Sequence, residues 1–408
     1  MTASKAKARV VIVGAGPVGM VCALALNKRG VAVTVLEQEP APVEDQRAAS
    51  LHPSTLEMLD DLGVTEQIIP LGLISSAYRF HDRVSDSVVA EFDLGQMRDE
   101  FRFPYVLQYE QYKLTASIAA EYGNAADFDV RFSHAVTGLT ETADGVDVEF
   151  STPAGTERID ADYVIGCDGG RSTVRKLAGI EFEGFTYPER FIKIATSFDF
   201  GKANAKVAFR NYFSDPSEWC NLFKVQGKRP PGLWRAIMPI QAEETDEIAL
   251  SPERIESRLQ KFFPNSSRYE IEYVNVYGAH QCVAATFRKG RVLLAGDSAH
   301  VNNPIGGMGM NGGIHDGINL AEKLARVFHG EAGDELLDLY SRQRRHAAAK
   351  YVQAQTIANK RLMEERDPAV RKRNFDELRR TAENPDTAKA YMRRAALADS
   401  LRDAAAIT

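Results

Sequence analysis

The stretch Arg9-Val-Val-Ile-Val-Gly-Ala-Gly-Pro-Val-Gly-Met20 decides the fold of this chain. Its apolar residues 10–13 predict a buried parallel strand, and the motif Gly14-x-Gly16-x-x-Gly19 follows without a gap. A helical pattern comes next, and residues 31–36 predict a second strand that ends at Glu37. These segments together form a βαβ unit.

This unit predicts a dinucleotide-binding site, because each glycine has a steric role. Gly14 permits a tight turn, Gly16 lets the backbone approach a pyrophosphate, and Gly19 lets helix and strand pack closely. The N–H groups of the helix N-terminus bind the phosphates, and the Glu37 carboxylate accepts hydrogen bonds from an adenosine ribose. The motif alone does not distinguish NAD from FAD, and a plain glycine-rich turn is the alternative. The residues expected at this site are Gly14, Ala15, Gly16, Pro17, Val18, Gly19, Glu37 and Gln38.

The composition narrows the class of protein. A chain of 408 residues, 44% hydrophobic and 26% charged, is typical of two closely joined globular domains. No apolar run approaches the roughly 18 residues that span a bilayer. The net charge of −6 gives no general attraction to nucleic acid or to an anionic membrane. The four cysteines lack CxxC spacing and no His/Asp/Glu set has metal-ligand spacing, so we expect a cytoplasmic protein without a metal ion.

Two further clusters of special residues lie far along the chain. Cys167-Asp168-Gly169 follows a series of strand patterns, and Gly296-Asp297-Ser-Ala-His300 follows a buried strand pattern. The glycine-rich run Asn303-Pro304-Ile-Gly-Gly-Met-Gly-Met-Asn311 comes next. In this order and at these distances, the clusters resemble the single-component flavin-dependent aromatic hydroxylases, the para-hydroxybenzoate hydroxylase family. The likeness covers roughly residues 8 to 350.

The resemblance implies both a cofactor and a reaction. The cofactor would be FAD, and NADH or NADPH would visit as a transient electron donor, since only one GxGxxG motif follows a strand. By resemblance, O2 adds to the reduced flavin at C4a, and the hydroperoxide transfers one oxygen atom to an aromatic, phenolic substrate. The protein must exclude water from this site and help to ionise the phenol.

The resemblance also implies which residues contact FAD. Asp297 would reach the ribityl hydroxyls from a strand end, although an aspartate here also suits the N-cap of a following helix. A helix expected from about Asn311 would direct its N-terminal dipole at the flavin ring. Asp168 matches a second family fingerprint, with a simple turn as the alternative. Arg171 and Arg175 either attract the donor's phosphates or belong to a solvated basic face. The further expected contacts are Arg47, Gln108, Val136, Pro304, Gly307, Gly309, Met310 and Asn311.

The substrate pocket has weaker sequence signals. If the analogy holds, the stretch 210–219 and the strand pattern 233–239 should line it. The candidates for binding or deprotonating a phenol are Tyr212, Arg210, His52 and His280, together with Pro304 of the glycine-rich run. A lone His or Tyr in a sheet is more often an ordinary core residue.

The expected fold is α/β: a Rossmann-like FAD-binding domain, an interleaved mixed β-sheet substrate domain and a helical C-terminus. The last segment, 346–408, either covers the substrate domain or forms a homodimer contact, and the sequence leaves both open. The expected boundaries are 1–72, 104–180 and 283–345 for the FAD domain, and 73–103 and 181–282 for the substrate domain.

Two other functions compete with hydroxylation. A flavin-dependent halogenase would carry a Trp-x-Trp-x-Ile-Pro stretch, but Leu233-Trp-Arg-Ala-Ile-Met-Pro239 has one tryptophan and the wrong spacing. A non-catalytic FAD-binding redox module remains open, although it would not explain an aromatic-rich second domain. The main expectation is a monooxygenase that acts on a small aromatic substrate and O2.

Overall fold

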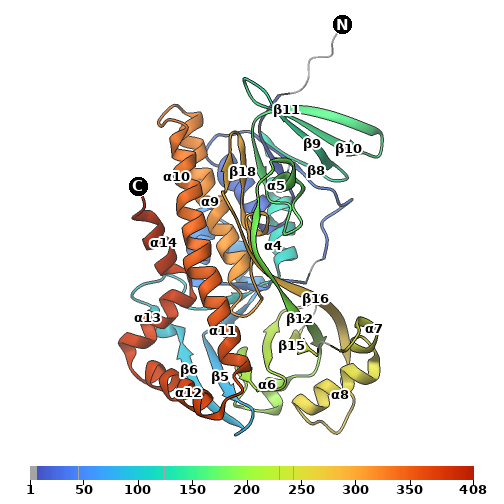
Figure 1. The fold of residues 1–408 in the computed structure, drawn as a ribbon, viewed down its shortest axis with the longest axis vertical. Coiled ribbons are helices and arrows are strands. Elements are labelled where there is room, and N and C mark those ends of the chain that lie inside the picture. Colours follow the sequence, from blue (N-terminus) through green and yellow to red (C-terminus); the bar gives the residue numbers. More distant parts are fainter. Residues whose placement is uncertain (1–6, 45, 124, 229, 242) are drawn as a thin grey trace.

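The computed structural model describes residues 7–408 except residues 45, 124, 229 and 242. Two eight-stranded sheets lie at opposite ends of the molecule, and long helices run beside both (Figure 1). A small third sheet, β3 (Ser50–Leu51), β7 (Val106–Gln108) and β4 (Leu73–Ser75), completes the strand structure. The architecture confirms the predicted α/β fold with an interleaved mixed sheet and a helical C-terminus.

The first sheet has a parallel centre. Its β1 strand pairs on both sides, with β2 and with β11, as expected for a βαβ unit. The helix that connects β1 to β2 is α1 (Pro17–Asn27), and it packs against α9 (Met308–Phe328) and α4 (Gln111–Tyr122). In spatial order the parallel strands are β18 (Val292–Leu294), β11 (Gly155–Gly166), β1 (Lys7–Val13), β2 (Val33–Leu36) and β8 (Phe128–Arg131). Three antiparallel strands complete the sheet: β17 (Arg288–Lys289) pairs with β18, and β9 (Ala135–Glu141) and β10 (Val146–Thr152) extend β11 as a meander.

The parallel arrangement brings the sequence motifs together. Val13 lies opposite Leu36 on one side and Gly166 on the other, and Gly166 lies opposite Leu294. Each motif begins within two residues of such a strand end. The GxGxxG loop, Glu37, the Asp168 turn and the Asp297 turn therefore meet at one edge of the sheet.

The second sheet is antiparallel except where β13 pairs with β5. One face packs on α8 (Pro252–Phe262) through an aromatic-rich core that includes Phe200 and Trp234. β19 lies directly after the Asp297 turn and pairs with β16, so the two sheets are joined beside the motifs. In spatial order the strands are β19 (His300–Val301), β16 (Ile271–Ala284), β12 (Phe182–Thr196), β15 (Leu233–Ile240), β14 (Cys220–Val225), β13 (Arg210–Ser214), β5 (Ala77–Asp82) and β6 (Ser87–Asp93).

The C-terminal helices cover the second sheet at its β6 edge. α12 packs on β6, and α13 packs on the short helix η2 (Leu94–Met97) (Figure 1). Residues 346–408, for which the sequence allows two roles, therefore include helices that pack on the second sheet. None of the helices in the described part of the chain is long and apolar enough to cross a membrane. The helices in order are α10 (Glu335–Ala347), a π-helical turn (Ala348–Gln353), α11 (Ala354–Glu364), α12 (Pro368–Glu383), α13 (Pro385–Ala395) and α14 (Ala398–Ala405).

Candidate functional site

The GxGxxG loop has the geometry that its glycines predict. Gly14 has a φ of +102°, and a Cβ there would lie 2.6 Å from the carbonyl oxygen of Cys167. A Cβ on Gly19 would lie 2.0 Å from the carbonyl oxygen of Gly14, so helix α1 packs backbone to backbone against the turn that follows β1. A Cβ on Gly16 would meet nothing within 4 Å. The loop is therefore closed behind Gly14 and Gly19 and open in front of Gly16.

Helix α1 presents its N-terminus to this open space. Its N-cap is Gly16, and no side chain caps it. The Glu37 carboxylate lies beside the loop, because its Oε2 accepts a hydrogen bond from the Ala15 N–H at 2.7 Å. Val136 is buried, and the N–H of His134, two residues before it, donates to the Glu37 carbonyl. Gln38, by contrast, is exposed on the loop that follows.

Asp168 and Arg175 have structural partners. The Asp168 carboxylate accepts hydrogen bonds from Ser172 Oγ and from the N–H groups of Thr173 and Val174 at the start of α5 (Thr173–Leu177). Arg175 is buried, donates to the carbonyls of Gly170 and Ser298, and lies over the ring of Phe182. The suggestion that Arg175 attracts donor phosphates is therefore wrong, because its guanidinium instead ties the Asp168 turn to the Asp297 turn.

A buried charge network supports the Asp297 turn from behind. Asp316 of α9 accepts hydrogen bonds from the Gly296 N–H at 3.1 Å, His300 Nε2 at 2.9 Å and Arg344 Nε at 2.6 Å. Burial alone would raise the pKa of Asp316, but Arg344 and His300 lower it below its usual value. Asp297 itself is half-buried, and α9 begins only at Met308 with Gly307 as N-cap, so Asp297 does not cap that helix.

The glycine-rich run connects the strand edge to α9. Gly306 and Gly307 have φ values of +109° and +67°, and the helix N-terminus after them has no side-chain cap. Asn311 donates to the carbonyls of Ser50 and Gly307 and accepts from the N–H of His52. These bonds fix the start of α9 against β3.

Other expected FAD contacts lie around this run. Gln108 is fully buried, its Oε1 accepts from Ser50 Oγ at 2.6 Å, and its Nε2 has no hydrogen-bond partner among the described residues. Pro304 begins the turn, Gly309 lies in the first turn of α9, and Met310 belongs to the core of the first domain. Arg47 is exposed on the loop between β2 and β3.

The residues at this edge fit FAD. The space in front of Gly16 and the uncapped α1 N-terminus suit a pyrophosphate, and the Glu37 carboxylate beside them suits a ribose. The Nε2 of Gln108, which has no hydrogen-bond partner among the described residues, and the uncapped α9 N-terminus offer donors to a flavin ring. The described residues include no group of three His, Cys, Asp or Glu side chains placed to hold a metal ion.

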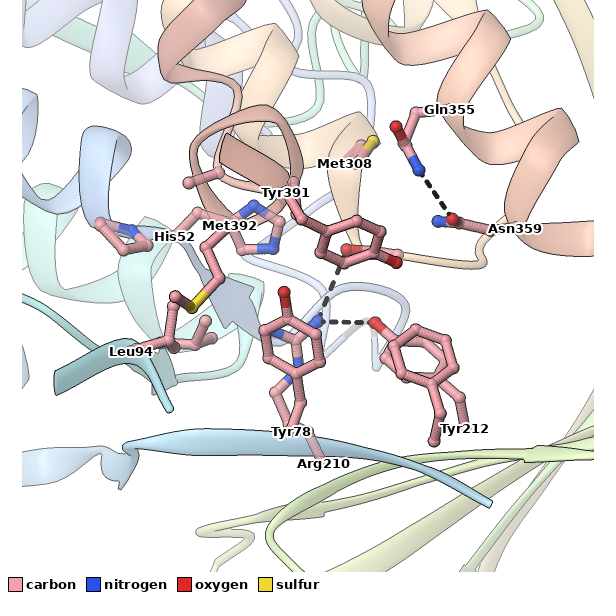
Figure 2. A pocket seen from close by; sticks show the side chains of 16 residues that line it. His52, Tyr78, Leu94, Arg210, Tyr212, Met308, Gln355, Asn359, Tyr391 and Met392 are labelled. Carbon is pink, nitrogen blue, oxygen red and sulfur yellow. Dashed lines mark hydrogen bonds between the residues drawn. The ribbon is translucent and has the colours of Figure 1, made fainter. Parts of the chain in front are cut away.

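A pocket lies between the glycine-rich run, the second sheet and the C-terminal helices (Figure 2). The cavity enclosed by its lining residues is small, about 30 Å³. No acidic residue lines it. The lining residues are His52, Pro53, Tyr78, Phe80, Leu94, Val106, Arg210, Tyr212, Gly306, Met308, Gln355, Asn359, Tyr391, Met392, Ala395 and Ala396.

Arg210 is the cation of this pocket. Its side chain is buried, and its Nη2 donates to the Tyr212 hydroxyl at 3.1 Å and to the Gly306 carbonyl at 3.5 Å (Figure 2). It also lies 5.8 Å from the ring centre of Tyr78. No carboxylate in the described part of the chain pairs with it, so its charge is balanced only by neutral oxygens and an aromatic face.

His52 and Tyr78 bring unpaired polar atoms to the same pocket. Neither ring nitrogen of His52 makes a hydrogen bond of normal geometry, although the carbonyls of Gly306 and Ala395 are near. Burial, reinforced by the charge of Arg210, lowers the pKa of His52 well below its usual value, so the ring is neutral at neutral pH. The Tyr78 hydroxyl also lacks a partner among the described residues, and burial raises its pKa.

The structure does not bring every expected residue to this pocket. His280 is exposed on β16 and bonds to Thr186 Oγ1, so it faces solvent instead of the pocket. Strand β15, which carries residues 233–239, lies two strands away from β13 in the sheet and does not line the pocket. Trp219 is buried beside Phe191 in a separate core.

Several lining residues were missed from the sequence. Tyr78 and Phe80 come from β5, and Asn359 and Tyr391 come from helices that carry no motif. An alternation of aromatic residues in 78–80 was the single local signal for any of them. The others depend on long-range packing.

Comparisons with known proteins agree with this geometry. A family model described as "FAD binding domain" matches residues 7–355. Para-nitrophenol 4-monooxygenase of Pseudomonas sp. (strain WBC-3) is 34% identical over 367 residues, which cover 90% of this chain and 89% of that protein. The crystal structure of p-nitrophenol 4-monooxygenase from Pseudomonas putida DLL-E4 has a TM-score of 0.90 and 31% identity, and the match covers 95% of this chain and 97% of that one.

A longer relative is also similar. The 3-(3-hydroxy-phenyl)propionate/3-hydroxycinnamic acid hydroxylase of Mycolicibacterium smegmatis (strain ATCC 700084 / mc(2)155) is 35% identical over 352 residues. These cover 86% of this chain, but the chain spans only 60% of that relative's length. The relatives are hydroxylases and monooxygenases, which favours this function over a halogenase or a redox module.

Proposed function

The chain belongs to the FAD-binding-domain family of FAD-dependent aromatic hydroxylases, and from this premise we propose that it hydroxylates a small single-ring phenol with NAD(P)H and O2. One oxygen atom of O2 enters the ring, and the other leaves as water with the two electrons of the donor. The two nitrophenol monooxygenases cover nearly the whole chain, and they favour a single-ring substrate over a larger one.

The observation that carries the proposal is the buried Arg210. An unpaired guanidinium in an aromatic pocket is costly, because burial removes its hydration without supplying a counter-charge. A bound phenolate would supply that charge. The pocket adjoins the glycine-rich run, so the substrate ring would lie next to the flavin-binding edge.

The cofactor and the residues of the pocket have different roles in the proposed reaction. Bound FAD supplies hydride acceptance from the nicotinamide donor and the activation of O2. Arg210 and Tyr212 hold the phenolic oxygen, and the positive charge of Arg210 favours the ionised form of the phenol. The neutral His52 ring offers a hydrogen-bond partner to the substrate. Phe80, Leu94 and the C-terminal helices exclude water from the ring.

The division of the chain follows the same proposal. We assign 1–72, 104–180 and 283–345 to cofactor binding and 73–103 and 181–282 to the substrate sheet. The first large sheet draws all its strands from the first set of ranges, and the second draws its strands from the second set apart from β19 and the end of β16. We place the protein in the cytoplasm because its four cysteines are free. The expected homodimer stays a prediction.

The test is turnover with purified, FAD-loaded protein. NADH or NADPH oxidation is followed with 4-nitrophenol and, separately, with 3-(3-hydroxyphenyl)propionate, and the products are identified by mass spectrometry. The proposal expects substrate-stimulated oxidation and an oxygenated product from 4-nitrophenol. Stimulation by the propionate alone would mean that Arg210 binds a carboxylate, and no stimulation by any phenol would overturn the proposal.

A further inference from the structure

We infer that the α13 wall, formed by Tyr391, Met392, Ala395 and Ala396, restricts the substrate to a single aromatic ring, with Tyr391 as the residue that excludes fused rings. This inference rests on the proposed function and concerns the same pocket. The α13 wall lies beyond residue 355, where the match to the family model ends. Selectivity would thus be set by a segment outside the shared FAD-binding region.

The Tyr391 ring is held rigidly in the pocket. It stacks on Phe92 with centroids 4.4 Å apart and an interplanar angle of 16°, and it meets Phe80 edge to face at 6.4 Å. Phe80 in turn stacks on Tyr212 at 4.8 Å, and Tyr212 is the partner of Arg210. Figure 2 shows Tyr391 across the pocket from Tyr78 and Arg210. A continuous series of aromatic contacts therefore runs from the α13 wall to the expected position of the bound anion.

Helix α13 is fixed on the side away from the pocket. Lys389 pairs with Asp99 at 2.7 Å, and Arg393 pairs with Glu100 at 2.9 Å. Met392 is buried in the core that α12 and α13 share with β6 and η2. Burial raises the pKa of Tyr391, so the wall carries no charge at neutral pH. Because the α13 wall is held by packing against α12, β6 and η2 and by these ion pairs, it should not move aside easily for a larger ligand.

The size of the effect follows from packing. Extra ring atoms forced into a packed site push side chains away from their preferred rotamers. A fused ring should therefore bind about tenfold or more weakly than a single ring with the same polar groups. Shortening Tyr391 should remove most of that difference.

The experiment compares two probes with the same phenol and para-nitro groups. 4-Nitrophenol has one ring, and 4-nitro-1-naphthol adds a fused second ring. The dissociation constant of each is measured by equilibrium dialysis against FAD-loaded enzyme without a nicotinamide donor. The variants are Tyr391→Leu and Tyr391→Phe, with Phe375→Leu as the matched control, since Phe375 lies in the same C-terminal core but does not line the pocket.

The wild type should prefer 4-nitrophenol, and Tyr391→Leu should shift the ratio of the two constants about tenfold towards the naphthol. Tyr391→Phe and Phe375→Leu should keep the wild-type ratio, because both leave the ring at position 391. If Tyr391→Leu loses its FAD, Met392→Ala opens the same wall and should shift the ratio in the same direction. An unchanged ratio in a variant that keeps its FAD overturns the inference, whereas a wild type that binds neither probe overturns the proposed function as well.

Discussion

Nη2 of Arg210 lies 3.1 Å from the hydroxyl oxygen of Tyr212, two residues along the same strand. Alternate residues of a strand point to the same face, so β13 presents this donor pair to the pocket as a unit. The Tyr212 ring is in turn held by stacking on Phe80 of the neighbouring strand. The position of the guanidinium is thereby set by the sheet and not by an ion pair.

Replacing Arg210 should weaken binding of an anionic ligand and spare the cofactor. We expect Arg210→Met to weaken 4-nitrophenol binding by about 10- to 100-fold, the value of one hydrogen bond to a charged group. FAD content should not change. The matched control is Arg79→Met on the adjacent strand, where the arginine pairs with Glu91 outside the pocket. Equal binding by both variants would contradict the role of Arg210.

The two glycines of the first loop should respond differently to alanine. Gly16→Ala has room for its methyl group, so the apoprotein should keep its melting temperature, but the methyl group should lower FAD affinity by about tenfold. Gly14→Ala should reduce the yield of folded protein, because its φ is +102° and Cys167 blocks the Cβ. FAD titration of deflavinated protein and thermal unfolding separate the two effects. Gly278→Ala, with equally open space on β16, should alter neither.

Asp316 should be one of the most sensitive buried positions. Asp316→Asn removes the counter-charge of the buried Arg344, and we expect a loss of about 3–5 kcal/mol in the free energy of unfolding. Asp376→Asn breaks an exposed i,i+4 pair with Lys372 and should cost far less, because water and salt screen that pair. Urea unfolding of both variants tests the difference. Similar losses would mean that the Asp316 network does not behave as a buried charge cluster.

The buried histidines predict a loss of stability in mild acid. Burial, reinforced by Arg344, lowers the pKa of His315 to about 3, while the unfolded chain keeps a value near 6.5. Above about pH 6.5 the His315 ring is neutral in both the folded and the unfolded chain. Below that pH the ring takes up a proton in the unfolded chain before it does so in the folded chain. The free energy of unfolding therefore falls as the pH decreases, by about 1.4 kcal/mol per pH unit for each such histidine. His81, with a pKa of about 4, adds to the same slope.

The measurement is the free energy of unfolding in urea at about pH 7 and about pH 5. His315→Asn should show a shallower loss than the wild type, because one titrating group is gone. His280→Asn, at an exposed position on β16, should keep the wild-type slope. Carboxylates such as Asp316 contribute to pH dependence only below about pH 4, where their unfolded-state pKa lies.

The cofactor side of the molecule was predictable because its signals are local. Apolar runs followed by Gly14 or Gly296 identify parallel strands and the turns after them, and neighbouring parallel strands bring such turns to one edge. The start of α9 was expected near Asn311 but lies at Met308, since Gly307 adopts the left-handed conformation that begins the helix. Arg175 was misjudged because its burial depends on Phe182 and Ser298, which no local pattern links to it.

The substrate side was predictable only in part. Arg210, Tyr212 and His52 were chosen for their chemistry, and the structure brings them to one pocket. Tyr78 and Tyr391 were missed, because their proximity depends on the docking of α13 on the β6 edge. No periodicity in a charged helical tail encodes that docking.

The pairing of β19 with β16 has a consequence for engineering. The two residues of β19 directly follow the Asp297 turn, yet they hydrogen-bond to the second sheet, and the Ala284 N–H donates to the Ala299 carbonyl beside them. The second sheet therefore cannot be exchanged as an independent unit, because hydrogen bonds join it to the residues after the Asp297 turn. If another substrate sheet were grafted onto this chain, it would have to form the same hydrogen bonds with β19. Otherwise the graft would displace the turn that carries Asp297.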